Sequence, residues 1–392
     1  MSIGIQHAPD AIQQTSSPRW QSIDLLRGAI MILMAIDHVR VYSGVPAGAM
    51  TAGIFFTRWI TNFCAPGFVF FTGTSAFLYG YKISNKSRLA GFLVTRGLLL
   101  VLLELTLIRF CWTFNVDYSK FVLAGVIWML GWCMVLLAAL VWFPPLVVGV
   151  IGLFIIFGQQ LFHTIPQDLG FHGMLSRWWE FIYPYADQDP PMGMAILYVL
   201  VPWIGVMAAG YGFGPIVQMD PAKRRKICLS VGITAILAFI IVGSVILLRS
   251  QATSDAPPFI LRLLRQNKYP ASPLFLLMTL GPLIALIPYA EKTKGWFSKV
   301  LITFGRVPLF YYLLHIPLIH LSALLVTYLR EGALYSAWYT SAPFTSVPEE
   351  HRWGLGLLYL IFALDVLILY FLCRWYAHYK STHPASKWLK YI

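Results

Sequence analysis

The sequence contains, between positions 19 and 40, the segment Arg19-Trp-Gln-Ser-Ile-Asp-Leu-Leu-Arg-Gly-Ala-Ile-Met-Ile-Leu-Met-Ala-Ile-Asp-His-Val-Arg40. It has the length of a membrane-spanning helix, which needs about 20 mainly apolar residues. Each charged group near the centre of such a helix costs about 2.5–3.5 kcal/mol on insertion scales. This segment nevertheless carries Asp24, Arg27, Asp37 and His38. Ionisable side chains inside a membrane helix are typical of a functional site.

Two of these side chains share one face of the expected helix. Arg27 and His38 are eleven positions apart, about three turns at roughly 3.6 residues per turn, and therefore roughly 16 Å apart along the axis. Asp37 points about 100° away from its neighbour His38, so we expect it to pair with Arg40, three positions further on. We interpret the shared face as a site with a cation at the membrane edge and an imidazole deeper inside, where it can accept a proton near neutral pH.

The composition places the whole chain in a membrane. Of the 392 residues, 58% are hydrophobic and 11% are charged, with a mean hydropathy of +0.69. The apolar runs are continuous rather than alternating, which favours helices over a β-barrel. The net charge of +13 is scattered between the runs rather than gathered on one face, so we expect no nucleic-acid partner. The fold class predicted is an all-α, polytopic transmembrane helical bundle.

About ten spans are expected. The predicted spans are 22–43, 54–81, 89–112, 120–143, 145–163, 192–217, 226–248, 272–290, 300–329 and 353–377. Pro144 and Pro145 predict a tight reversal between the fourth and fifth spans. The ninth span is long for one crossing, so its first part is expected to lie at the surface around Trp296, with the membrane part starting near Gly305.

Lysine and arginine alternate between the two sides of these spans, which predicts that both termini are cytoplasmic. We therefore expect a single transmembrane domain over 21–378, between cytoplasmic tails at 1–20 and 379–392. The basic loop 250–270 breaks the alternation on the outer side and is a candidate for function. Two long outer loops, 164–191 and 331–351, are rich in tryptophan and tyrosine. Their aromatic rings fit either an interfacial belt or stacking on a sugar.

Four blocks of sequence resemble a known family. They are Ser22-Ile-Asp-Leu-Leu-Arg-Gly28, Cys64-Ala-Pro-Gly-Phe-Val-Phe-Phe-Thr-Gly-Thr-Ser-Ala-Phe-Leu78, Asn267-Lys-Tyr-Pro-Ala-Ser-Pro-Leu-Phe-Leu-Leu-Met-Thr-Leu-Gly281 and Gly305-Arg-Val-Pro-Leu-Phe-Tyr-Tyr-Leu-Leu-His315. Together they resemble the catalytic domain of heparan-α-glucosaminide N-acetyltransferase and its bacterial relatives. The spacing from Arg27 to His38 is also similar to that in bacterial membrane O-acetyltransferases.

The resemblance implies a multi-pass acyltransferase of the bacterial cytoplasmic membrane. Acetyl-CoA, as co-substrate, would enter from the cytoplasm and its acetyl group would pass to a sugar amine or hydroxyl on the far side. The lysosomal enzyme has its catalytic histidine in the loop after this first helix, whereas residues 39–70 of this chain contain none. We therefore expect direct transfer with His38 as general base, rather than an acetyl-histidine intermediate.

The remaining site residues follow from this interpretation. We expect Asp24, Arg27, Arg96 and Arg306 to bind the CoA phosphates, and Asn267, Lys268 and His315 to bind the acceptor, without a metal. The expected partners are a glycan or amino-sugar acceptor and membrane lipids, and homo-oligomerisation is left open.

Two other classes of function share the predicted spans. A secondary transporter of a small polar solute would also bury charges, but it is expected to show paired broken helices, which the sequence does not indicate. A purely structural role leaves the charges of the first span unexplained. Thermal stabilisation by acetyl-CoA would favour the transferase.

Overall fold

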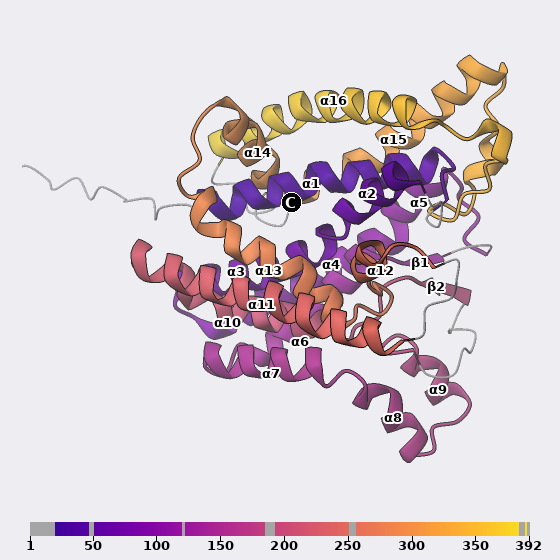
Figure 1. Ribbon diagram of the computed structural model, residues 1–392. Coiled ribbons are helices and arrows are strands. Elements are labelled where there is room, and N and C mark those ends of the chain that lie inside the picture. The colour runs from indigo at the N-terminus through magenta and orange to yellow at the C-terminus, as the bar shows by residue number, and fades with distance from the viewer. Residues whose placement is uncertain are drawn as a thin grey trace, which may run out of the picture.

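The computed structural model describes residues 20–46, 51–119, 122–184, 193–250, 256–383 and 389. Within these residues the chain is almost entirely helical, with two short strands (Figure 1). The elements in chain order are α1 Gln21–Tyr42, α2 Ala52–Thr61, α3 Cys64–Ile83, α4 Lys86–Leu103, the π-helical turn η1 Glu104–Ile108, α5 Arg109–Thr113, β1 Val122–Ala124, α6 Val126–Leu140, α7 Pro145–Phe157, α8 Leu161–Asp168, α9 Met174–Trp179, β2 Met194–Ile196, α10 Trp203–Val217, α11 Pro221–Arg249, α12 Phe259–Leu264, α13 Pro273–Ala290, α14 Trp296–Arg306, α15 Pro308–Glu331, the 3₁₀ turns η3 Ser336–Tyr339 and η4 Glu349–His351, and α16 Leu355–Thr382.

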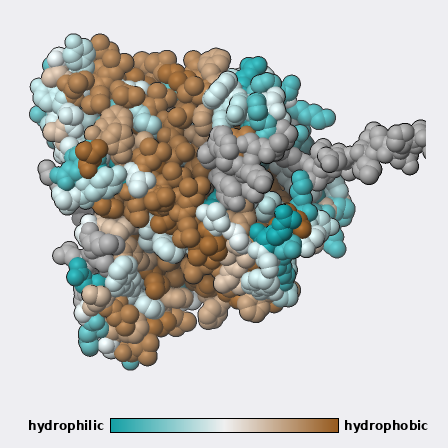
Figure 2. Space-filling model, turned by 180° about the vertical axis from the view of Figure 1, so that it is seen from behind, coloured by the Kyte–Doolittle hydropathy of each residue, from teal (hydrophilic) through white to brown (hydrophobic). Residues whose placement is uncertain are grey.

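The long apolar helices give the molecule a membrane belt. Figure 2 shows a broad band of hydrophobic side chains between two more hydrophilic ends. Among the described residues, six helices are long and apolar enough to cross a membrane, or seven if α7 and α8, which meet at a bend of 73°, form one span. The prediction of a helical membrane protein is therefore confirmed. The count of ten spans and the cytoplasmic placement of both termini stay predictions.

Three predicted spans differ from the observed helices, two of them at their first residues and one in its interior. The spans expected from 120 and 192 begin instead as β1 and β2, which pair in parallel so that Val122 lies opposite Met194. The helices that follow, α6 and α10, have 15 residues each. At about 1.5 Å per residue they are shorter than the roughly 30 Å hydrocarbon core. The third, expected over 145–163, is divided at Phe157 between α7 and α8.

Two expected breaks between helices are present. α7 starts at Pro145 after a turn, as the proline pair predicted. The ninth predicted span is divided into α14 and α15, which meet at Val307. The surface segment expected around Trp296 is thus a separate helix, and Trp296 is 76% exposed. The predicted tails lie largely outside the described residues, as do Tyr185 in the first aromatic loop and Lys387 near the C-terminus.

Helix α1 lies between α16 and α13 (Figure 1) and packs against α2, α3, α13, α14, α15 and α16. Its crossing with α14 is especially close, because Gly28 and Gly305 lie at the contact. A Cβ atom on Gly28 would come within 1.8 Å of the Leu301 carbonyl oxygen, and one on Gly305 within 1.8 Å of the Asp24 carbonyl oxygen. Small residues allow membrane helices to approach in this way. Arg27 precedes Gly28 and Arg306 follows Gly305 in the sequence. The crossing therefore brings the two arginine side chains to one side of the bundle.

Candidate active site

A cavity of about 490 Å³ opens beside the α1–α14 crossing, and we call it the arginine cavity. Its wall combines apolar side chains with four basic ones from four different helices: Arg27, Arg96, Arg306 and Lys380. The guanidinium of Arg96 also lies 5.9 Å from the centre of the Phe92 ring. A concave site with several cations is suited to bind a ligand that carries more than one phosphate.

Arg27 is held in place by neighbours on three helices. Its Nη2 donates a hydrogen bond to the Ser75 hydroxyl of α3 at 2.7 Å, and its Nη1 lies 3.5 Å from the Asp24 carboxylate of α1. The same Nη1 donates to the Gly305 carbonyl oxygen of α14 at 3.5 Å. Asp24 is 5% exposed and does not line the cavity. Asp24 is therefore placed to orient Arg27, and direct binding of the CoA phosphates by Asp24 stays a prediction.

His38 lines a second cavity, of about 480 Å³, which we call the histidine cavity. Asp37, Trp112, Tyr198 and Lys268 also line it. Asp37 forms the expected ion pair with Arg40, at 3.0 Å, so it is not available to orient the imidazole. Part of the second aromatic loop, residues 343–347, closes one side of the cavity.

His38 forms a hydrogen-bonded pair with a second histidine. Its Nδ1 lies 2.7 Å from Nε2 of His315, while Nδ1 of His315 lies 2.7 Å from the Tyr312 carbonyl oxygen. His315 is completely buried and lines neither cavity. The structure thus places the His315 side chain against His38 and not on a cavity wall, where the acceptor was expected to bind. On the other side of His38, the Trp112 ring contacts the imidazole edge to face, with centroids 4.8 Å apart.

The two cavities meet at a wall formed by Tyr312 and Val126, which line both of them. Tyr312 is only 5% exposed, and it lies one helical turn before His315 on α15. A group at the inner end of the arginine cavity would therefore be separated from the histidine cavity by little more than one aromatic side chain.

Glu104 holds the backbone next to Val126 at this wall. It begins the π-helical turn η1, a local widening of the helix that is frequent at functional sites. Its carboxyl Oε2 accepts hydrogen bonds from the backbone N–H groups of Ile127 at 3.0 Å and Trp128 at 3.3 Å. These donors belong to the first turn of α6, whose N-cap residue, Gly125, has no capping side chain. Glu104 therefore caps α6 and fixes Val126 at the wall.

Comparison with known families identifies the class of protein. The family described as heparan-alpha-glucosaminide N-acetyltransferase, catalytic, matches residues 19–247, more than half of the chain. The chain belongs to this family. The family and the six long apolar helices together indicate a transmembrane acetyltransferase. No curated protein sequence matches the chain significantly.

The family match includes Arg27, His38 and Arg96 but ends before the other predicted site residues, Asn267, Lys268, Arg306 and His315. Tertiary packing brings Arg306 to the arginine cavity and Lys268 to the histidine cavity. Burial lowers the pKa of Lys268, but the nearby phenols of Tyr198 and Tyr269 and the Asp37 carboxylate raise it more. Lys268 is thus a cation and not a candidate base.

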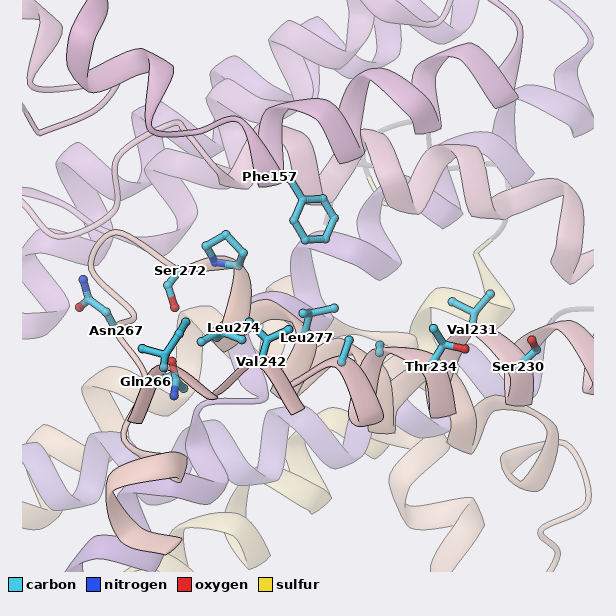
Figure 3. A pocket seen from close by; sticks show the side chains of 14 residues that line it. Phe157, Ser230, Val231, Thr234, Val242, Gln266, Asn267, Ser272, Leu274 and Leu277 are labelled. Atoms are coloured by element: carbon cyan, nitrogen blue, oxygen red, sulfur yellow. The ribbon is translucent and has the colours of Figure 1, made fainter. Parts of the chain in front are cut away.

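Asn267 does not line the histidine cavity. It lies at one end of an apolar groove on the outside of the bundle, between α7, α11 and α13 (Figure 3). Figure 3 shows Phe157 on one side of this groove and Val231 and Val242 of α11 along it. These adjacent residues of one loop thus face different sites, and acceptor binding by Asn267 stays a prediction.

Sequence reasoning missed three residues of the two cavities. Lys380 lies in the predicted cytoplasmic tail, 379–392, yet it lines the arginine cavity. Glu104 lies within the predicted span 89–112, and its neighbours in the sequence do not indicate that it caps another helix. Tyr312 lies in a quoted block, three positions before His315. This helical spacing indicated a shared face, but nothing in the sequence indicated a wall between two cavities.

Proposed function

We propose that this protein transfers an acetyl group from cytoplasmic acetyl-CoA to an amine or hydroxyl group of a sugar on the other side of a bacterial cytoplasmic membrane, with His38 as general base. One observation carries the proposal: a cavity lined by four cations and a cavity lined by His38 end at the same thin wall. This arrangement suits a donor and an acceptor that arrive from opposite sides and react where the cavities meet.

The arginine cavity would bind the donor. CoA carries a diphosphate and a 3′-phosphate, and Arg27, Arg96, Arg306 and Lys380 could share these charges at the mouth of the cavity. The apolar part of the wall would accommodate the pantetheine arm. On this basis the thioester would lie near Tyr312, at the inner end.

The histidine cavity would bind the acceptor. Its walls offer the ring of Tyr198 for stacking on a sugar and the ammonium of Lys268 for hydrogen bonds to hydroxyl or carboxyl groups. The apolar groove of Figure 3, outside both cavities, would be filled by membrane lipid chains.

The proposed reaction is a direct transfer. The acceptor nitrogen or oxygen attacks the thioester carbonyl carbon while Nε2 of His38 takes the proton from the attacking group. The new N–C or O–C bond forms, the C–S bond breaks, and the CoA thiolate leaves. The imidazolium of His38 then returns its proton to the thiolate, which gives CoA, the acetylated sugar and neutral His38.

A secondary transporter remains the second candidate, because two cavities separated by one side chain also resemble a gated solute path. Purified protein in sealed vesicles separates the two functions. With labelled acetyl-CoA on the arginine side and glucosamine on the other, the transferase produces labelled N-acetylglucosamine or an O-acetyl sugar only on the glucosamine side. Movement of unmodified glucosamine, with no thermal stabilisation of the protein by acetyl-CoA, would instead establish transport.

Arg27→Gln should weaken donor binding. The substitution removes one charge from the arginine cavity, and hydrogen bonds to charged groups contribute about 1.5–3 kcal/mol. We therefore expect the Kd for acetyl-CoA, measured by calorimetry, to rise about 10- to 100-fold. Arg88→Gln is the matched control, since Arg88 is exposed on α4 and does not line the cavity. Equal affinities of the two variants would contradict this role for Arg27.

Tyr312→Ala should join the two cavities. Water from the histidine cavity would then reach the thioester, so we expect hydrolysis of acetyl-CoA without acceptor to rise several-fold. Tyr312→Phe keeps the ring and should hydrolyse acetyl-CoA at the wild-type rate. Thiol release, followed with a chromogenic disulfide reagent, measures both. If the alanine variant is folded and shows no extra hydrolysis, Tyr312 does not separate donor from water.

A further inference from the structure

The hydrogen-bond chain behind His38 assigns a role to His315 that goes beyond the function proposed above and rests on it. We propose that His315 is a positioning residue, which holds His38 in the tautomer whose Nε2 is unprotonated and which stabilises His38 after that nitrogen has taken a proton. His315 itself touches neither substrate, because it lines neither cavity.

The positions of the protons follow from the acceptors. A backbone carbonyl can only accept, so Nδ1 of His315, 2.7 Å from the Tyr312 carbonyl oxygen, must carry a hydrogen. In neutral His315 this leaves Nε2 as an acceptor. The donor across the 2.7 Å contact is then Nδ1 of His38. Neutral His38 therefore has its lone pair on Nε2, the nitrogen not used in the pair.

The ring geometry agrees with an in-plane hydrogen bond. The two rings are inclined by 23°, and their centroids are 4.8 Å apart, well beyond the 2.7 Å between the bonded nitrogens. The rings therefore meet edge to edge rather than face to face. Such a bond restrains the rotation of the His38 ring as well as its tautomer.

The surroundings of His315 hold it rigidly. Its ring packs against Tyr311, with centroids 5.2 Å apart, and it is completely buried. The Tyr311 hydroxyl donates to the Met31 carbonyl oxygen at 2.9 Å, which joins α15 to α1 two turns before His38. The helix that carries His315 is thus fixed relative to the helix that carries His38.

The His38–His315 pair also stabilises His38 after it has become an imidazolium. When His38 takes a proton on Nε2, its Nδ1–H becomes a stronger donor to Nε2 of His315, and His315 in turn donates more strongly to the Tyr312 carbonyl. The carboxylate nearest in sequence, Asp37, is paired with Arg40. His315 therefore has the place that a carboxylate or carbonyl takes behind other catalytic histidines.

Three substitutions test this role. The terminal amide of glutamine reaches the position of histidine Nε2, whereas that of asparagine reaches only the position of Nδ1, and leucine has no acceptor. In the vesicle assay we expect His315→Asn and His315→Leu to lower kcat about 10²-fold, with an unchanged KM for acetyl-CoA. His315→Gln should recover most of the lost rate, because its amide oxygen can accept the bond from His38.

A second measurement does not depend on activity. The ¹⁵N chemical shifts of labelled histidine distinguish the two neutral tautomers, and the signal of His38 is the one missing in His38→Ala. In the wild type it should report a hydrogen on Nδ1, and in His315→Leu it should change to a mixture of tautomers.

The activity and tautomer measurements distinguish a failure of the proposed acetyl transfer from a failure of the positioning role of His315. If the wild type transfers no acetyl group, the proposed function fails, while the tautomer measurement still tests the pair. If the wild type is active, a folded His315→Leu with wild-type kcat overturns the positioning role. A glutamine variant as slow as leucine, or an unchanged tautomer in His315→Leu, overturns it as well.

Discussion

Replacement of His38 by alanine is expected to lower the rate of acetyl transfer by about 10²–10⁴-fold, the usual contribution of a positioned general base. His38 lies on the wall of its cavity rather than in the packed core, so the loss should come from chemistry and not from unfolding. The arginine cavity is formed by other residues. The variant should therefore bind acetyl-CoA as the wild type does, and acetyl-CoA should still raise its melting temperature.

His172→Ala is the control for this substitution, since His172 is exposed on the surface and lines neither cavity. Single-turnover transfer from labelled acetyl-CoA measures the chemical step in both variants. A folded His38→Ala that transfers at the rate of His172→Ala would exclude His38 as the base. Mass spectrometry of the wild type with acetyl-CoA alone should find no acetyl group on His38, as expected for direct transfer.

Glu104→Ala should destabilise the whole protein. The substitution leaves the backbone N–H groups of Ile127 and Trp128 without their acceptor, in a region where Glu104 is 1% exposed. A buried donor without a partner costs about 1–3 kcal/mol, so the free energy of unfolding should fall by about 2–6 kcal/mol. Because Val126 at the wall is in the same turn, transfer should also slow.

Glu104→Gln keeps one carbonyl oxygen at the same place and should lose clearly less stability. Glu350→Ala is the control, because the side chain of Glu350 is 71% exposed. Unfolding by sodium dodecyl sulfate in mixed micelles, followed by tryptophan fluorescence, gives the three stabilities. If the alanine variant is as stable as the control, Glu104 does not cap α6.

Much of the candidate site could be predicted along α1 and little of it elsewhere. The helical repeat placed Arg27 and His38 on one face and paired Asp37 with Arg40, because side-chain directions along one helix follow from sequence spacing. Helical spacing does not predict contacts between residues that are far apart in the chain. The partner of His38 is 277 positions away, and the structure places it against His38 rather than on the wall of either cavity.

The sequence by itself determined that this protein is a membrane bundle, approximately where its helices lie, and which face of α1 carries ionisable groups. Apolar run length and helical spacing are local properties, and the bilayer allows few alternatives to the helix. Only the tertiary structure places His315 against His38, puts Tyr312 between the two cavities and brings Lys380 into the same cavity as Arg27. Membrane helices pack through small residues and shape rather than through a hydrophobic contrast readable in the sequence. The close α1–α14 crossing at Gly28 and Gly305 therefore becomes apparent only in three dimensions.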